Sequence, residues 1–289
     1  MEPKIELPKS LLEIPSEINF AELHAKRTIN LRVKPERPPL AISIGLDDRE
    51  YKGVHYPLRF ATYGNISMIK GEEKSRKSFL KSLIIACAIG GNSNIYSNDI
   101  KGHDLQDKYI VDIDTEQGEY DNWMAANRIP EMVGKPHMPF YPENYIAVNL
   151  REENPKERRQ YLQWLFMESD YRSKLGLVAI DGYVDMLMDF NSQSESSEFT
   201  QDLMKFSAAS KAHITGILHV NPGQEKGRGH LGTILQQKCE TVVIIKDQGQ
   251  YSEVRCSRVR GSKKFTPFKL EVNDFWLPHE TGKITEDWI

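Results

Sequence analysis

Cysteine is scarce in this sequence, and neither a long hydrophobic run nor a strong excess of one charge is present. The chain of 289 residues has three scattered cysteines, Cys87, Cys239 and Cys256, and no C-x-x-C pair. This argues against a disulfide framework or a thiolate zinc site and fits a reducing environment. No apolar stretch approaches the ~20 residues of a membrane span, and residues 1–6 lack the apolar core of a secretory signal. We therefore expect a cytoplasmic protein with no membrane partner.

The overall charge excludes a uniformly basic nucleic-acid binder but not a local basic stripe. Lysine and arginine number 38 against 41 acidic residues, which gives a net charge of −3. Between Lys246 and Lys269, however, basic residues clearly outnumber Asp247 and Glu253. The content of 39% hydrophobic and 27% charged residues is typical of a globular protein with one large or two ordinary domains.

The pattern along the chain separates a terminal arm from a dense α/β domain. Residues 1–39 are rich in proline and charge, and we interpret them as an arm and linker with one helix near 20–27. Residues 40–289 are predicted to form the domain. Its apolar strands are expected at 40–44, 58–63, 66–71, 109–113, 145–148, 175–181, 214–219 and 241–245, with a closing antiparallel hairpin at 251–259 and 268–272. Helices are expected at 77–89, 119–129, 157–174 and 199–212. This alternation predicts a mainly parallel sheet with helices on both faces.

One stretch has the layout of a strand, a phosphate-binding loop and a helix. An apolar strand ends in Gly71, a short polar loop follows, and Lys77-Ser78 opens an amphipathic segment. Backbone N–H groups of such a loop point at phosphate oxygens, the lysine reaches the β- and γ-phosphates, and the hydroxyl binds Mg²⁺. The match to G-x-x-x-x-G-K-[ST] is imperfect because Arg76 stands where a glycine is usual. If that position is helical, an arginine fits there with its side chain turned outward.

Polar residues at the ends of three later strands support this interpretation. Asp181 ends a buried strand, where a carboxylate can hold Mg²⁺ directly or through water. Asp114 and Glu116 follow an earlier strand, and either could orient or deprotonate a water that attacks the γ-phosphate. His219 ends a further strand, where it could sense whether the γ-phosphate is present. Taken alone, each is also compatible with a structural role.

In this order, the motifs resemble the RecA-like ATPases, most closely the RepA/DnaB branch of replicative helicases and related ATPases of plasmids and mobile elements. The resemblance covers about residues 55–275. It implies that Lys77 and Ser78 bind phosphate and Mg²⁺, that Asp181 is the second metal-binding residue, and that Glu116 is the catalytic base with His219 as sensor. The implied ATP-binding segment comprises Gly71, Lys74, Ser75, Arg76, Lys77, Ser78 and Phe79.

The same resemblance implies partners for the remaining segments. Residues 189–197 and 221–229 match the two loops that face the DNA channel of ring helicases, so Lys226 and Arg228 would contact the phosphates of single-stranded DNA. Arg258 and Arg260 match the position from which an arginine finger enters the active site of a neighbouring subunit. The resemblance therefore implies a homo-oligomer, such as a hexamer. The first of the two loops is acidic and serine-rich, which departs from the pattern of the family.

The sequence leaves more than one function open. The leading hypothesis is an oligomeric Mg²⁺-dependent ATPase that acts with DNA in replication or mobilisation. The alternative is a nucleotide-binding assembly or regulatory module that hydrolyses slowly, or not at all, and recruits protein partners. A small-molecule kinase also uses a phosphate-binding loop, but the sequence has no signature of a lid or an acceptor pocket.

Overall fold

The computed structural model describes residues 18–221, 227 and 229–284. The chain divides into two units, one that ends at Arg37 and one that starts at Pro38. In the described part of the first unit, helix α1 (Phe20–Arg27) begins at the predicted position, where the side chain of Asn19 accepts a hydrogen bond from the N–H of Glu22. None of its residues is buried. Within the described ranges, every helix is too short or too polar to cross a lipid bilayer.

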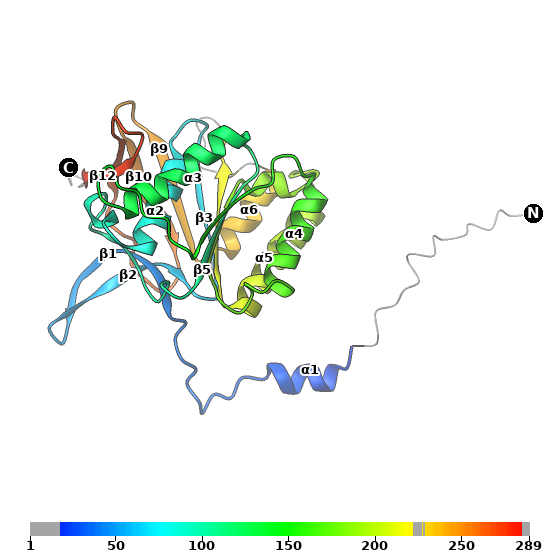
Figure 1. The fold of residues 1–289 in the computed structure, drawn as a ribbon. Helices are drawn as coiled ribbons and strands as arrows, with labels where there is room; N and C mark the ends of the chain where they lie inside the picture. Colours follow the sequence, from blue (N-terminus) through cyan, green and yellow to red (C-terminus); the bar gives the residue numbers. More distant parts are fainter. Residues whose placement is uncertain (1–17, 222–226, 228, 285–289) are drawn as a thin grey trace, which may run out of the picture. The chain divides into compact units, whose positions relative to one another are not determined.

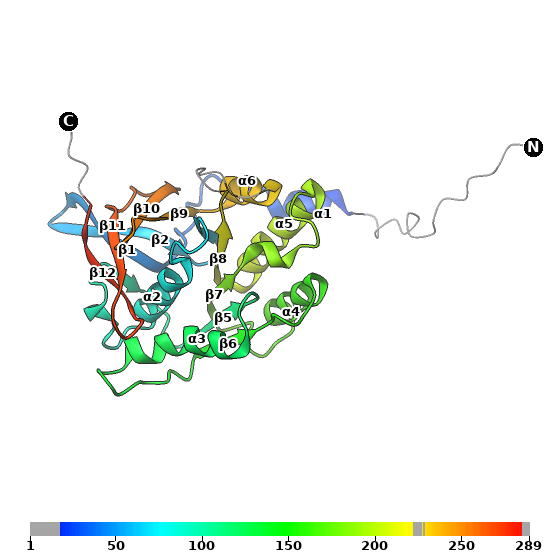
Figure 2. The ribbon, with the colours of Figure 1, turned by 90° about the horizontal axis from the view of Figure 1, so that it is seen from above.

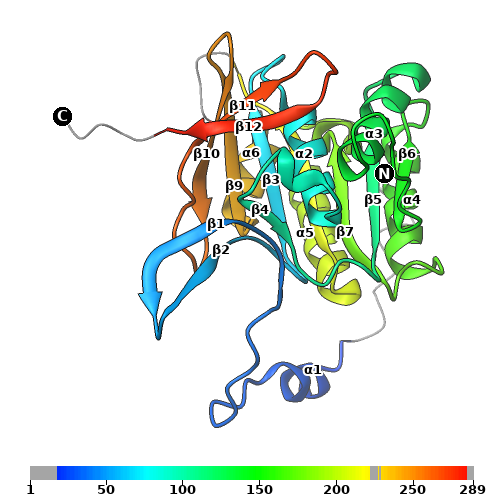
Figure 3. The same cartoon turned by 60° about the vertical axis from the view of Figure 1, so that its left-hand side comes forward.

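The second unit is built on a nine-stranded sheet with the order β12-β11-β10-β9-β3-β8-β7-β5-β6. Its parallel part contains β3 (Ile66–Gly71), β5 (Tyr109–Asp114), β6 (Tyr145–Asn149), β7 (Leu175–Asp181), β8 (His213–His219) and β9 (Thr241–Asp247). The antiparallel part contains β10 (Ser252–Val259), β11 (Phe268–Val272) and β12 (Pro278–Lys283). Figure 3 shows these last strands at one end of the sheet. The predicted α/β fold with a mainly parallel sheet and a C-terminal antiparallel segment is confirmed.

Helices cover both faces of this sheet, as Figures 1 and 2 show. On one face lie α2 (Lys77–Ile89) and α3 (Glu119–Val133), and on the other α4 (Pro155–Met167), α5 (Gln193–Ser210) and α6 (Gly229–Lys238). Successive strand residues point to opposite faces, so that Ile69 joins the first core and Met68 the second. Because both faces are buried, the central strands are continuous apolar runs rather than alternating ones.

A second, smaller sheet corrects one prediction. The segments predicted at 40–44 and 58–63 are strands but do not join the nine-stranded sheet: they form β1 (Leu40–Tyr51) and β2 (Val54–Thr62), which pair with each other, and β1 also pairs with β4 (Ile100–Gly102). The order in this sheet is β2-β1-β4. Both long strands extend past the predicted ends to form a polar hairpin. Strands β4 and β12 were not predicted, because they are short and carry little apolar pattern.

Two predicted helices have different limits in the structure. Helix α4 ends at Met167 rather than near residue 174, because the polar residues that follow form a turn in which the Ser169 hydroxyl donates to the carbonyl of Leu165. Helix α5 begins at Gln193 rather than 199, with Ser192 as its N-cap. The serine-rich segment 189–197, predicted to be a loop, is therefore helical in its second half. Ser and Asp are strong capping residues, and their clustering here marks a helix start.

Candidate functional site

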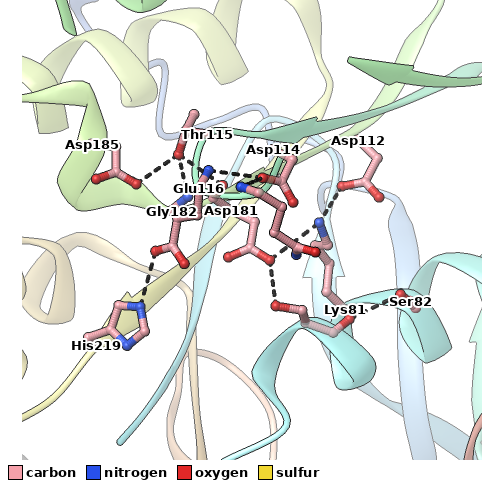
Figure 4. Close-up of polar contacts among 12 residues, drawn as sticks. Lys81, Ser82, Asp112, Asp114, Thr115, Glu116, Asp181, Gly182, Asp185 and His219 are labelled. Atoms are coloured by element: carbon pink, nitrogen blue, oxygen red, sulfur yellow. Dashed lines mark hydrogen bonds and ion pairs between the residues drawn. The ribbon is translucent and has the colours of Figure 1, made fainter. Parts of the chain in front are cut away.

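The parallel strands bring the predicted polar residues to one edge of the sheet. Gly71 at the end of β3 is level with His219 at the end of β8, and Asp114 of β5 is level with Asp181 of β7. In parallel α/β sheets, the crevice beyond the carboxyl ends of the strands is where ligands bind. Figure 4 shows the side chains that converge there. The site therefore draws its residues from segments that lie far apart in the sequence.

The loop between β3 and α2 is a tight turn with two left-handed residues. Lys74 and Arg76 both adopt the left-handed conformation, with φ angles of 62° and 68°. The Ser75 hydroxyl donates to the carbonyl of Glu72 at 2.7 Å and stabilises the turn. At Gly71 a Cβ atom would lie 2.4 Å from the carbonyl oxygen of Ile245, so this position requires glycine. The loop thus combines left-handed residues as do turns that can direct backbone N–H groups at an anion.

Arg76 replaces glycine at a position that does have the conformation of glycine. It lies just before helix α2 rather than within it. The expectation that an arginine fits here because the position is helical is therefore wrong. The side chain is turned away from the loop interior, where its guanidinium contacts Asp247 at 3.0 Å, the Ser252 hydroxyl at 2.9 Å and the Gly249 carbonyl at 2.8 Å. These contacts at the β9–β10 turn hold the arginine in its left-handed conformation and tie the loop to the sheet.

Helix α2 begins at Lys77, so both residues of the Lys-Ser pair face the loop. The first intrahelical bond runs from the N–H of Leu80 to the carbonyl of Arg76, and the N–H groups of the first turn precede it. The Lys77 ammonium donates to the carbonyl of Glu72, and burial lowers the pKa of this lysine. The Ser78 hydroxyl donates to Oδ2 of Asp181 at 2.7 Å. The structure therefore joins the two predicted metal-binding residues directly.

Glu116 and His219 meet across the crevice. Nε2 of His219 lies 3.1 Å from Oε1 of Glu116, and this hydrogen bond lowers the pKa of the glutamate. Asp114, the other candidate base, accepts hydrogen bonds from the N–H groups of Glu116 and Gln117 at 2.9 and 2.8 Å. Asp114 is buried and supports the turn from within, whereas Glu116 reaches the crevice. Of the two carboxylates, Glu116 is placed to contact a ligand.

A second layer of residues holds the Glu116 turn. The Thr115 hydroxyl contacts the carbonyl of Asp181 at 2.9 Å and Oδ2 of Asp185 at 2.8 Å, and it accepts from the N–H of Gly182 at 2.9 Å. Burial raises the pKa of Asp185. From α4, the buried Arg158 donates to the backbone carbonyls of four residues in the loops after β5, β6 and β7, namely Leu150, Arg151, Thr115 and Asp185. The ends of three strands are thereby locked together.

A second lysine of α2 lies beneath the site. The Lys81 ammonium is 2.7 Å from Oδ1 of Asp112 and 3.5 Å from Oδ2 of Asp181. The hydroxyl of Tyr145 donates to the other oxygen of Asp112 at 3.2 Å. Although burial opposes the charged form of Lys81, the neighbouring Asp112 and Asp181 raise its pKa. The two carboxylates therefore favour the charged form of Lys81 beneath the site.

Phe79 lines an aromatic pocket beside the β3–α2 loop. Its ring stacks on that of Trp276 at a centroid distance of 6.5 Å. The guanidinium of Arg128, a residue of α3, lies 3.9 Å from the centroid of the Phe79 ring. A cavity of about 410 Å³ adjoins these rings and is lined by Arg76, Phe79, Val272, Asn273, Asp274 and Trp276. A flat heterocycle would find aromatic and polar edges here.

The two predicted finger arginines lie at the opposite edge of the sheet. Strand β10 runs antiparallel to β9, which places Arg258 beside Val242, near the start of the parallel strands. Nη1 of Arg258 donates to the carbonyl of Gln236 at 2.9 Å, and Arg260 donates to that of Gln237, at the end of α6. Neither arginine reaches the crevice of its own chain. Lys226 and Arg228, the predicted DNA contacts, lie outside the described residues.

The sequence motifs do not include the supporting residues. Thr115, Asp185, Arg158 and Lys81 belong to no motif that names them, and their roles depend on contacts between distant segments. One feature of the sequence does point to a role for Lys81. It stands one helical turn after Lys77 on a helix whose neighbouring residues are apolar. A lysine in that setting needs a buried partner.

Comparison with known proteins supports the fold and leaves the finer classification open. No family model matches the chain, and no curated protein matches it. Among solved structures, the crystal structure of the RadB recombinase is 15% identical, with a TM-score of 0.52 over 75% of this chain and 91% of that chain. The chain thus shares its fold with this recombinase. At this level of identity, the similarity concerns the fold alone.

Proposed function

We propose that the protein is an oligomeric, Mg²⁺-dependent ATPase that acts with DNA, as a helicase-like motor of replication or mobilisation. The observation that carries the proposal is the convergence of Lys77, Ser78, Asp181 and Glu116 on one edge of a RecA-like sheet. The RepA/DnaB type of helicase remains the branch that the order of the motifs favours. Nothing in the geometry of the loop opposes nucleotide binding, because Arg76 takes the conformation that glycine would have.

The donor set fits a nucleotide with its metal. The Ser78 hydroxyl and the Asp181 carboxylate are hard oxygen ligands, and together with phosphate oxygens they suit Mg²⁺, which neutralises charge on the phosphates when bound. Lys77 would exchange its contact with the Glu72 carbonyl for phosphate oxygens. We assign the aromatic pocket beside Phe79 and Trp276 to the base, which would stack there. Each group is thus assigned to one part of the ligand.

Glu116 and His219 would complete the reaction. Because its hydrogen bond with His219 lowers the pKa of Glu116, the carboxylate is ionised at neutral pH and can accept a hydrogen bond from an attacking water. When the γ-phosphate is bound, His219 can exchange its partner and pass the change to the segment after β8. That segment carries Lys226 and Arg228, which would contact DNA phosphates without sequence preference.

The test is ATP hydrolysis with and without single-stranded DNA in wild type and in Lys77→Ala. We expect DNA to stimulate phosphate release in wild type and the variant to lose at least about 10²-fold, as for removal of a group that stabilises transition-state charge. Asp181→Asn should lose activity together with Mg²⁺-dependent nucleotide binding. Equal, low phosphate release in wild type and Lys77→Ala, whether DNA is present or absent, would refute the proposal.

One observation favours the alternative of a slow regulatory module. The segment that would be the first channel loop is acidic and partly helical, and its Glu195, like Glu198 just after it, bonds within the chain. Glu198 pairs with Arg159 at 2.9 Å, and Glu195 accepts from the N–H of Met188 at 2.8 Å. This surface is unsuited to a polyanion. ATP binding with self-association but without DNA binding at low salt would select this alternative.

A further inference from the structure

Lys81 occupies a position where two buried carboxylates face one another. Its ammonium lies 2.7 Å from Asp112 and 3.5 Å from Asp181, and the three side chains are only 5%, 7% and 3% exposed. The ammonium shares Oδ2 of Asp181 with the Ser78 hydroxyl, which contacts the same oxygen at 2.7 Å. Figure 4 shows Lys81 directed between the two aspartates. No motif assigns a role to this lysine.

We propose that Lys81 is a built-in cation that keeps the space between Asp112 and Asp181 closed to a second divalent ion. It thereby acts as a positioning residue that sets the metal affinity of the Ser78–Asp181 pair. The inference rests on the proposed function, because Mg²⁺ at Ser78 and Asp181 is part of that proposal. It adds a determinant of how many metal ions the site takes and how tightly.

Lys81 balances the charge of two buried carboxylates. Two carboxylates around one point are the ligands that hard divalent cations prefer, and buried carboxylates without a counter-charge are strongly disfavoured. The lysine supplies that counter-charge on a tether, so it cannot exchange with solvent ions. Its charge lies behind Asp181 and repels a metal ion on the other side of that carboxylate. An affinity for Mg²⁺ that depends on the nucleotide phosphates follows from this arrangement.

The Lys81 ion pair also connects separate elements of the fold. Tyr145 fixes Asp112 from β6, and α2 fixes Lys81, so the ion pair joins the helix that carries Lys77 and Ser78 to the strands that carry Asp112 and Asp181. A purely structural ion pair would affect stability alone. A built-in cation affects metal binding as well, and the two roles can be separated by measuring both.

The experiment is Mn²⁺ binding to the full chain, followed by electron paramagnetic resonance and calorimetry with and without a non-hydrolysable ATP analogue. In wild type we expect one Mn²⁺ per chain that requires the nucleotide. In Lys81→Met we expect Mn²⁺ to bind without the nucleotide. With the nucleotide analogue present, Mn²⁺ should bind at least about tenfold more tightly than to wild type, because a unit charge a few ångströms away is removed. Lys81→Met combined with Asp112→Asn should return to the behaviour of wild type, and Lys81→Arg should resemble wild type throughout.

A folded Lys81→Met variant with the same Mn²⁺ stoichiometry and affinity as wild type overturns the inference. If this variant fails to fold, Asp112→Asn alone decides. Its lysine is left with Asp181 as sole partner and competes with the metal, so Mn²⁺ affinity should fall several-fold. An unchanged affinity there also overturns the inference. Failure of the proposed function looks different, because wild type would then bind no Mn²⁺–nucleotide complex whatever happens at Lys81.

Discussion

At the scale of single residues, the β3–α2 loop shows how a side chain can compensate for an unfavourable backbone. Arg76 has a φ of 68°, a conformation that costs a residue with a Cβ atom roughly 1–2 kcal/mol. Its guanidinium recovers part of that cost through three contacts at the β9–β10 turn. The departure from the glycine pattern is therefore tolerated because the arginine has a docking place that the sequence motif does not record.

This explanation predicts an order of stability for two variants. Arg76→Ala keeps the strained backbone and loses the contacts, so it should unfold more easily than wild type. Arg76→Gly loses the same contacts but relieves the strain, and it should be more stable than the alanine variant by about 1 kcal/mol. Urea unfolding measures both. If alanine proves as stable as glycine, the left-handed backbone at this position carries no cost and the explanation fails.

His213 predicts a dependence of stability on pH. Its ring is fully buried between the Thr62 carbonyl and the Ser67 hydroxyl, and burial lowers its pKa from 6.5 to about 4. The unfolded state then binds the extra proton between pH 6.5 and 4, so acidification lowers the free energy of unfolding. The contribution, up to about 3 kcal/mol, is complete above pH 6.5 and is lost as the pH falls through this window.

The measurement is the free energy of unfolding in urea at several pH values between 7.5 and 4. His213→Gln removes the titrating group but can still hydrogen bond. We expect the variant to be less stable at pH 7.5 and to show a shallower loss on acidification. Parallel curves for wild type and variant would show that the buried histidine does not cause the acid sensitivity.

At the scale of elements, the sequence predicts what depends on pattern and misses what depends on contact. The apolar runs identify the central strands because burial on both faces requires them, and Gly71, Asp181 and His219 follow from their positions at strand ends. Strand β12, the aromatic pocket and the Lys81 ion pair could not be predicted in this way. Trp276 comes to Phe79 only because the β11–β12 turn folds back toward the start of α2.

The position of Trp276 in the β11–β12 turn leads to a prediction about how the base of a bound nucleotide would be held. Trp276→Ala should raise the Kd for an ATP analogue about tenfold or more, since stacking on an aromatic ring contributes roughly 1–3 kcal/mol per base. The Kd for inorganic tripolyphosphate, which has no base, should stay the same. Titration followed by calorimetry compares the two ligands. An equal loss for both would mean that the tryptophan supports the loop instead of contacting the base.

At the scale of the whole molecule, the position of the two late arginines bears on assembly. Arg258 and Arg260 lie at the sheet edge opposite the crevice and hold the carbonyls at the end of α6. Within one chain they cannot stabilise charge on a bound phosphate. If they contribute to turnover, they do so in a neighbouring copy, and the active unit is then an oligomer in which each site is shared.

Mixing experiments test this sharing. Arg260→Ala and Lys77→Ala should each be inactive alone, because one lacks the finger and the other the phosphate-binding lysine. In a mixed assembly, a Lys77→Ala subunit can lend its intact arginine to the intact loop of an Arg260→Ala subunit, so ATP hydrolysis should partly return. Arg260→Lys is the matched control, since it keeps the charge but not the forked geometry. The free energy of unfolding of Arg260→Lys in urea measures the stability lost with the α6 contact. This measurement separates loss of that contact from loss of the finger. Absence of any recovery in a mixture that demonstrably co-assembles would restrict both arginines to supporting α6 within their own chain.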